Sequence, residues 1–362
     1  MVVHYLGAQR DGLRPKTGLK LYIMLVRPIL EYAMPVIVFN KTHMKKLEQL
    51  QLRILRRVVG LRKNTKRATV RVVTGTEPME TRLAFLKLKH HYRILLKPDH
   101  SLVKTIFNKI GEQKARPGFL KECRTLCQNF GIPYSRVVPE FVGGQQQPLA
   151  DFGDELKEEL YYISFQRDLQ KVKNSGQAST LASLFPPDTS YFSYRPLDLI
   201  TRVLVGQNRT VRTLFLQNLC GTSFLANRYR NSCHFCGKNE STIDHYIFDC
   251  PNIAEKRASF LLKVENHVSK TDPLLKKIWD ESIENENRRN LCAILFGGNF
   301  AVQGNGETLL FRKSRYTIKS HHSDKTVLLT AAFMEELQQT LGSDGAEPRS
   351  GTSERGAGAD AR

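Results

Sequence analysis

Acidic residues are scarce in this chain relative to basic ones. Its 362 residues include 35 Asp and Glu against 55 Lys and Arg, which gives a formal net charge of +20 and a pI near 9.7. A chain this basic is attracted to polyanions, first to nucleic acid and second to an anionic membrane surface. The excess lies mainly at the start, because residues 1–100 hold 21 Lys and Arg but only 6 Asp and Glu.

The pattern of a secretory signal and that of a membrane-spanning run are also missing from this sequence. Residues 1–6 show no charged segment followed by an apolar one, so we expect an intracellular protein, nuclear or cytoplasmic, that is not secreted. The apolar stretch at residues 21–39 contains Arg27, Glu31, Pro28 and Pro35, all costly or disruptive within a bilayer. We therefore expect no membrane partner and assign this stretch to the soluble core.

Three of the seven cysteines stand with a histidine in the pattern C-x2-C-x8-H-x4-C. The four residues are Cys233, Cys236, His245 and Cys250. Three thiols and one imidazole match the ligand preference of Zn²⁺, and four protein ligands leave no open position for an activated water. We predict one structural Zn²⁺ here; the alternative is four unrelated residues in a reduced chain.

The residues around this set suit such a site. Gly237 allows a tight turn after the second cysteine. Ser241 or Thr242 can cap a short helix that carries His245. Two ligands at i and i+5 do not share one face of an α-helix, so we expect Pro251 to end that helix before Cys250.

A basic helix that runs into a basic loop is the second candidate site. The helix spans residue 43 to about residue 61, with an expected apolar stripe of Leu47, Leu50, Ile54, Val58 and Leu61. We expect the cations to form a phosphate track, with a solvated face of an interaction helix as the alternative. They are Lys45, Lys46, Arg53, Arg56, Arg57, Arg62, Lys63, Lys66, Arg67 and Arg71.

Three stretches resemble the C-terminal part of a reverse transcriptase from a LINE-type, non-LTR retrotransposon. The first is residues 18–32 with Lys46-Leu47-Glu48 and Gln51, which is similar to the thumb-like segment just after the polymerase palm. The second is Gly75, Glu77-Pro78-Met79 and Arg82 with residues 98–102, which looks like the family's connector. The third is residues 200–206, the Cys/His set and Pro251, which is similar to its C-terminal zinc-knuckle region.

The resemblance implies a mainly α fold. We expect a basic thumb-like helical domain at residues 1–105, a connector at 106–195 and a small zinc-stabilised helical region at 196–300. Residues 301–362 stay unassigned, and the tail should be disordered from about residue 342, because it has no large apolar side chain.

The chain departs from the family where the chemistry would be. Polymerase activity needs paired carboxylates that hold two metal ions, and no Asp-Asp dipeptide occurs in this sequence. We also expect no endonuclease or RNase H residues, because the segments before residue 18 and between connector and knuckle are too short for such domains.

We therefore expect a nucleic-acid-binding fragment of a retrotransposon reverse transcriptase, with RNA template and target DNA as partners. A palm-containing reverse transcriptase chain is a further possible partner. One alternative is a zinc-stabilised protein-interaction module recruited by the host. The other is the RNA-directed DNA polymerase that similarity alone suggests.

Overall fold

The computed structural model describes most of the chain between residues 14 and 343. The described residues are 14–112, 118–139, 141–142, 145–146, 148–175, 179–185, 194, 207, 209–223, 232–239, 242–271, 273–296, 300–304, 307–311 and 320–343. The expected disordered tail lies outside them from residue 344 on, and so does the stretch 200–206 of the resemblance.

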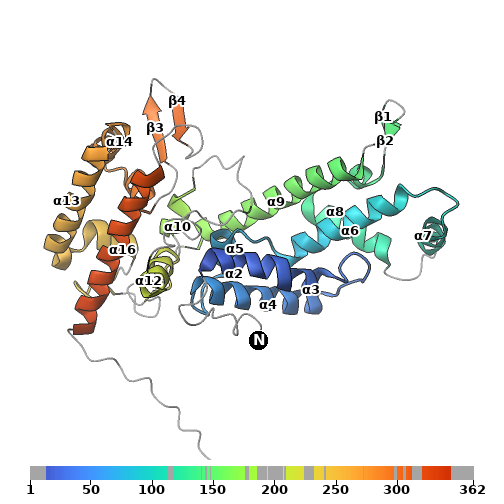
Figure 1. Cartoon of the computed structure of the whole chain (residues 1–362), viewed down its shortest axis with the longest axis horizontal. Helices are drawn as coiled ribbons and strands as arrows, with labels where there is room; N and C mark the ends of the chain where they lie inside the picture. Colours follow the sequence, from blue (N-terminus) through green and yellow to red (C-terminus); the bar gives the residue numbers. More distant parts are fainter. Residues whose placement is uncertain are drawn as a thin grey trace, which may run out of the picture.

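Helices dominate both halves of the molecule, as predicted (Figure 1). The N-terminal half contains α2 (Pro15–Leu21), η1 (Tyr22–Val26), α3 (Arg27–Glu31), α4 (Lys41–Val59), α5 (Arg67–Thr74), α6 (Met79–Leu95), α7 (Leu102–Glu112), α8 (Phe119–Phe130), η2 (Tyr134–Val137) and α9 (Leu149–Lys173). The C-terminal half contains α10 (Ser179–Ser183), α12 (Arg209–Leu219), η4 (His245–Asp249), η5 (Pro251–Ile253), α13 (Ala254–Thr271), α14 (Pro273–Glu284), α15 (Arg288–Phe296) and α16 (Ser320–Ser343).

Two short antiparallel hairpins are the only strands among the described residues. One pairs β1 (Phe141–Val142) with β2 (Gln145–Gln146), and the other pairs β3 (Phe300–Gly304) with β4 (Glu307–Phe311). Within the described part of the chain, no helix is both long and apolar enough to cross a membrane.

The segment around Pro28 is less buried than the sequence suggested. A proline has no N–H to donate, and the helix widens into the π-helical turn η1 before α3 begins, with the Arg27 amide donating to the Tyr22 carbonyl. Tyr22 and Met34 are fully buried, but Met24, Ile29 and Tyr32 are 69%, 77% and 89% exposed. The assignment of residues 21–39 to the core was therefore wrong for much of this stretch.

Helix α4 buries only part of the predicted apolar stripe. Asn40 caps its first turn by accepting from the His43 amide, and Gly60 ends it at φ 77°. The buried side chains are Gln51, Leu52, Leu55, Val58 and Val59, whereas Leu50 is 40% exposed. Of the five predicted stripe residues, Val58 and Leu61 are buried, whereas Leu47, Leu50 and Ile54 are only partly buried or exposed. Helices α2, α5 and α6 pack against α4.

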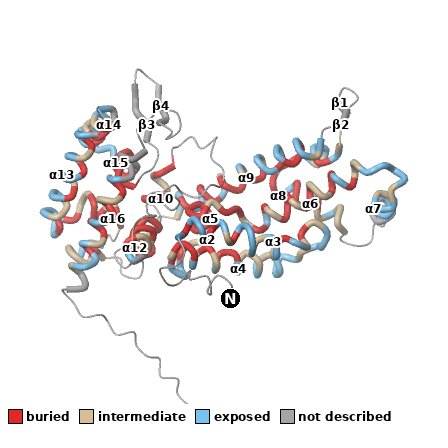
Figure 2. The backbone as a smooth tube through the Cα atoms, in the orientation of Figure 1, coloured by how far each residue is buried: buried red, intermediate tan, exposed pale blue. Residues whose placement is uncertain are grey.

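The core does not divide at the predicted boundaries of residues 105 and 195. One hydrophobic cluster runs from Leu19 and Leu55 in the first predicted domain to Cys233 and Met334 in the last two. A second cluster joins α6 and α8 to the first half of α9. Helix α9 contributes to both clusters, and buried residues follow it along its length (Figure 2).

Helix α16 is a core element that the sequence analysis did not assign. Val327, Met334 and Leu337 are fully buried in the larger cluster, and Phe333 stacks on Phe260 of α13 with 4.4 Å between ring centroids. Thr326 and Thr330 donate to backbone carbonyls at the end of α15. The C-terminal half is thus closed by residues 320–343, which pack against α12, α13 and α15.

Two buried ionic groups hold the N-terminal helices together. In the first, Arg82 makes a bidentate contact with Glu31 at 2.6 and 2.7 Å, and Arg27 contacts both Glu31 and Glu77. The Tyr161 hydroxyl of α9 donates to Glu77 at 2.5 Å. Despite burial, hydrogen bonding to Arg82 and the charge of Arg27 hold the pKa of Glu31 below its ordinary value.

The second group centres on Arg71 of α5. Its guanidinium donates to Asp168 of α9 at 2.5 and 2.6 Å and to Glu48 of α4 at 2.6 Å. The other Glu48 oxygen accepts from the Met79 amide at the start of α6, and the Tyr194 hydroxyl donates to Asp168. One buried cation therefore fixes three helices relative to one another.

Replacement of Arg71 by leucine would leave the Asp168 carboxylate buried without its guanidinium. We expect the free energy of unfolding to fall by about 3–5 kcal/mol, measured by urea denaturation followed with circular dichroism. The control is Arg57→Leu at an exposed position of α4, which should change the stability by about 0.5 kcal/mol or less. Equal effects of the two substitutions would contradict this role for Arg71.

Candidate metal centre and basic groove

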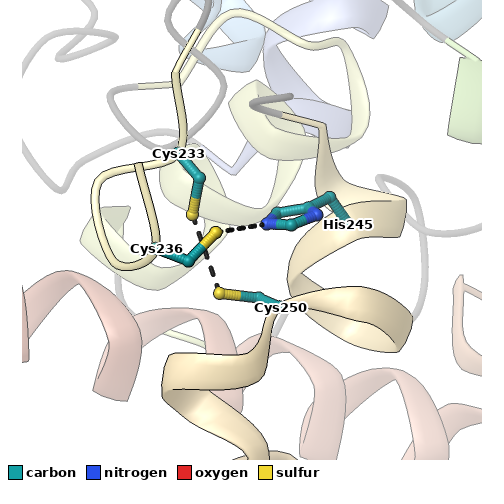
Figure 3. A group of neighbouring side chains, drawn as sticks. All are labelled: Cys233, Cys236, His245 and Cys250. Carbon is teal, nitrogen blue, oxygen red and sulfur yellow. Dashed lines mark hydrogen bonds between the residues drawn. The ribbon is translucent and has the colours of Figure 1, made fainter. Parts of the chain in front are cut away.

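The four predicted ligands come together in one cluster (Figure 3). The Cys233 and Cys250 sulfurs lie 3.7 Å apart, and the Cys236 sulfur lies 3.3 Å from His245 Nε2. All four ligand atoms are within 4.8 Å of one another. A tetrahedron with bonds of about 2.3 Å has edges of about 3.8 Å, so the cluster could hold one metal ion.

A tight turn presents the first two cysteines. The Gly237 amide donates to the Cys233 carbonyl at 3.0 Å, and the Cys233 amide donates to the Lys238 carbonyl at 2.7 Å. Gly237 adopts φ 72°, which confirms the predicted need for glycine. The Phe235 amide points at the Cys233 sulfur at 3.4 Å, so the backbone supplies a donor to one ligand.

A wide helical turn presents the other two ligands. Thr242 caps it, since its hydroxyl accepts from the His245 amide at 3.1 Å. The Cys250 amide donates to the His245 carbonyl at 2.8 Å, an i to i+5 bond that closes the π-helical η4. Cys250 itself is extended and Pro251 begins η5, so the predicted end of the helix before Cys250 is confirmed.

The cluster is built into the larger core. Cys233, His245 and Cys250 are buried, while Cys236 is partly exposed. Arg257 of α13 donates to the Cys250 carbonyl at 2.8 Å, and Asn252 donates to the Phe235 carbonyl at 2.5 Å. Side chains outside the ligand set therefore hold both halves of the site in place.

The thiols of the cluster differ in acidity. Burial and the hydrogen bond with Cys233 raise the pKa of Cys250 to about 12. Burial also opposes ionisation of Cys236, but hydrogen bonds from the Lys238 backbone and the neighbouring thiols lower its pKa overall. Three thiolates this close repel one another, and a bound cation would relieve that repulsion.

Most of the predicted phosphate track lies on the surface. The exposed members are Lys45, Lys46, Arg53, Arg57, Arg62, Lys63 and Arg67. None of the seven forms an ion pair with a described carboxylate, although Arg62 donates to Gln217 at 3.1 Å. Their charge is therefore not neutralised by the described part of the chain.

Three members of the predicted track have structural contacts instead. Arg71 was wrongly included, because it is 7% exposed and its charge is taken up by Glu48 and Asp168. Arg56 is half-buried and donates to the Thr65 carbonyl at 2.6 Å, and burial together with Arg67 lowers its pKa. Lys66 donates to the Ser175 carbonyl at 3.2 Å.

A groove of about 780 Å³ lies among α4, α5, α6, α8 and α9. Four members of the predicted track line it, namely Lys45, Lys66, Arg67 and the buried Arg71. It also brings in three cations that the sequence analysis missed, namely Lys41, Arg167 and Lys171. Arg167 and Lys171 are four residues apart, a spacing that places two cations on one face of a helix. The sequence around them did not indicate that this face of α9 would lie opposite α4.

Comparisons of the chain with protein-family models, with curated proteins and with solved structures found no match. The resemblance to LINE-type reverse transcriptases therefore stays a prediction, carried by the residues that suggested it.

The ligand assignment predicts about one metal ion per purified chain and its loss in a single-ligand variant. His245→Ala should lower the metal content and speed hydrogen exchange across residues 233–250, because coordination energy there is folding energy. His234→Gln is the matched control, since this histidine lies in the same turn but outside the ligand cluster. Full metal content in His245→Ala, measured by atomic emission, would show that the ligand set is wrong.

Proposed function

We propose that the chain is a nucleic-acid-binding fragment of a retrotransposon reverse transcriptase that holds RNA template and target DNA. The observation that supports this best is the group of exposed cations on α4 and the loop after it, which form no ion pair with a described carboxylate. A helix face and loop of this kind contact phosphates and carry little sequence information. The formal net charge of +20 would in addition attract a nucleic acid over longer distances.

We propose Zn²⁺ as the ion of the Cys/His cluster, in a structural role. Thiolate and imidazole ligands in a tetrahedral arrangement favour zinc over the harder divalent cations. With four protein ligands the ion has no open position, so its contribution is to fix the turn at residues 233–239 against η4. Zinc would then stabilise the C-terminal half, where the ligands already belong to the core.

We propose that the chain itself has no polymerase, endonuclease or RNase H activity, and that a palm-containing chain would supply synthesis. In the described structure, buried carboxylates such as Glu31, Glu77 and Asp168 contact arginines. Carboxylates engaged in this way are not available as ligands for a pair of catalytic metal ions.

A protein-interaction module is the second candidate function, and the exposed apolar strip at residues 23–38 favours it. Large apolar side chains that project from η1, α3 and the loop after it are Ile23, Met24, Leu25, Ile29, Tyr32, Val36, Ile37 and Val38. Contiguous exposed apolar residues commonly mark a protein contact. The resemblance makes a palm-containing reverse transcriptase chain our proposed occupant, since this strip is similar to the segment just after the palm.

Salt dependence separates the two candidates. Binding of the chain to an RNA–DNA duplex should weaken steeply with salt, with a slope of log K against log salt near −0.9 per phosphate contacted. Arg53→Ala/Arg57→Ala should make that slope shallower by about 1.8. Fluorescence anisotropy over a salt series measures the slope for the unaltered chain and for the double variant. A chain that binds neither this duplex nor single-stranded RNA at low salt would rule out the nucleic-acid function.

Primer extension tests the proposed lack of catalysis. The purified chain, supplied with primed RNA, deoxynucleotides and Mg²⁺, should extend no primer, because two-metal chemistry needs paired carboxylates. A reverse transcriptase added to a parallel reaction controls for substrate quality. Primer extension that persists through purification and co-elutes with the chain would contradict the proposal.

A further inference from the structure

The groove among α4, α5, α6, α8 and α9 is lined by seven basic and four acidic residues. Three of the four carboxylates are already satisfied inside the protein. Glu48 and Asp168 share Arg71, and Glu122 contacts the buried Lys87. Only Glu80 is an exposed acid, so the groove has an excess of positive charge that faces solvent.

The remaining cations enter the groove from separate helices. Lys41 and Lys45 come from the first turns of α4, and Arg167 and Lys171 come from the last turns of α9. Lys66 and Arg67 stand at the start of α5, the helix that packs against both α4 and α9. None of the six forms an ion pair with a described carboxylate. A chain of phosphates that passes through the groove would meet them in succession.

The groove also has apolar and planar surfaces. Phe39, Met44 and Leu126 line it beside the charged side chains. The Arg167 guanidinium lies over the Phe130 ring, 5.2 Å from its centroid, and donates to the Asn129 carbonyl at 2.6 Å. A guanidinium group can also stack on a base, and apolar side chains accept bases regardless of sequence.

The size of the groove favours a single strand of nucleic acid over a double helix. Cavities of about 300–1,000 Å³ enclose a drug-sized molecule, which corresponds to a few nucleotides of an extended strand. A double helix is far wider and could lie only across the rim. Positive charge combined with stacking surfaces is typical of grooves that bind single strands.

We propose that this groove binds a single-stranded segment of nucleic acid, with Lys41, Lys45, Arg167 and Lys171 as phosphate contacts. The inference rests on the proposed nucleic-acid function and deepens it, because it gives single strand and duplex different surfaces. The exposed Arg53 and Arg57 on α4 lie outside the groove and serve duplex binding.

The test compares two double variants of the full chain on two probes. The groove variant is Lys45→Ala/Lys171→Ala, and the matched control is Arg53→Ala/Arg57→Ala, all at exposed positions. The probes are an end-labelled oligouridylate and an RNA–DNA duplex. We expect the groove variant to lose on the order of tenfold affinity for oligouridylate and to flatten its salt slope by about 1.4. Its duplex affinity should change much less.

The control variant loses the same two positive charges as the groove variant, so an effect of net charge alone would be equal in both. A third variant tests the groove without removing a cation. Thr125 is exposed and lines the groove, so Thr125→Glu should weaken oligouridylate binding without removing any cation. Thermal unfolding of each variant checks that the fold is intact.

The outcomes separate the two proposals. If the unaltered chain binds neither probe, the proposed function fails. If it binds both, and the groove variants bind oligouridylate as tightly as the unaltered chain, the groove assignment is wrong while the function stands. Equal losses for the groove and control variants on both probes would also overturn the assignment.

Discussion

The Arg71 guanidinium is the contact on which the arrangement of the N-terminal helices depends. It lies between Glu48 of α4 and Asp168 of α9, while Glu48 also accepts the first amide of α6. Burial of an arginine with two carboxylates costs desolvation free energy, and removal of one partner costs more because it leaves a buried charge unpaired. The contact therefore favours one arrangement of these helices. The basic groove lies over this contact, and its cations keep their spacing because α4, α5 and α9 are fixed beneath them.

The distribution of charge follows from the same constraint. Acidic residues are few, and several of them are buried in ion pairs. Glu31 and Glu77, for example, neutralise Arg27 and Arg82. Buried charges are tolerated only when paired, so these carboxylates cannot screen the surface. The exposed cations of α4, the loop after it and the end of α9 therefore keep a positive charge that faces solvent. Residues that carried the resemblance, such as Gln51 and Glu77, thus have packing roles here, since Gln51 donates to the Glu77 carbonyl.

The features that the sequence predicted well are local ones. The spacing of Cys233, Cys236, His245 and Cys250 was enough, because eighteen residues with two turns can close such a cluster by themselves. The mainly α class, which the resemblance implied, also agrees with the structure. The burial of Arg71 and the contribution of α9 to the groove depend on residues about a hundred positions apart in the sequence. The exposed apolar side chains within residues 23–38 could not be told from core residues by their composition. The pattern of charges in a sequence does not show whether an arginine binds a phosphate or forms an ion pair with a buried aspartate.

The central claim is that α4, α5 and α9 together hold nucleic acid. Lysine acetylation footprinting with mass spectrometry tests it most directly, in the presence and absence of oligouridylate. Lys45 and Lys171 should be protected together, whereas the exposed Lys263 on α13 should be labelled equally in both samples. Protection of Lys263 with no change at Lys45 and Lys171 would contradict the account.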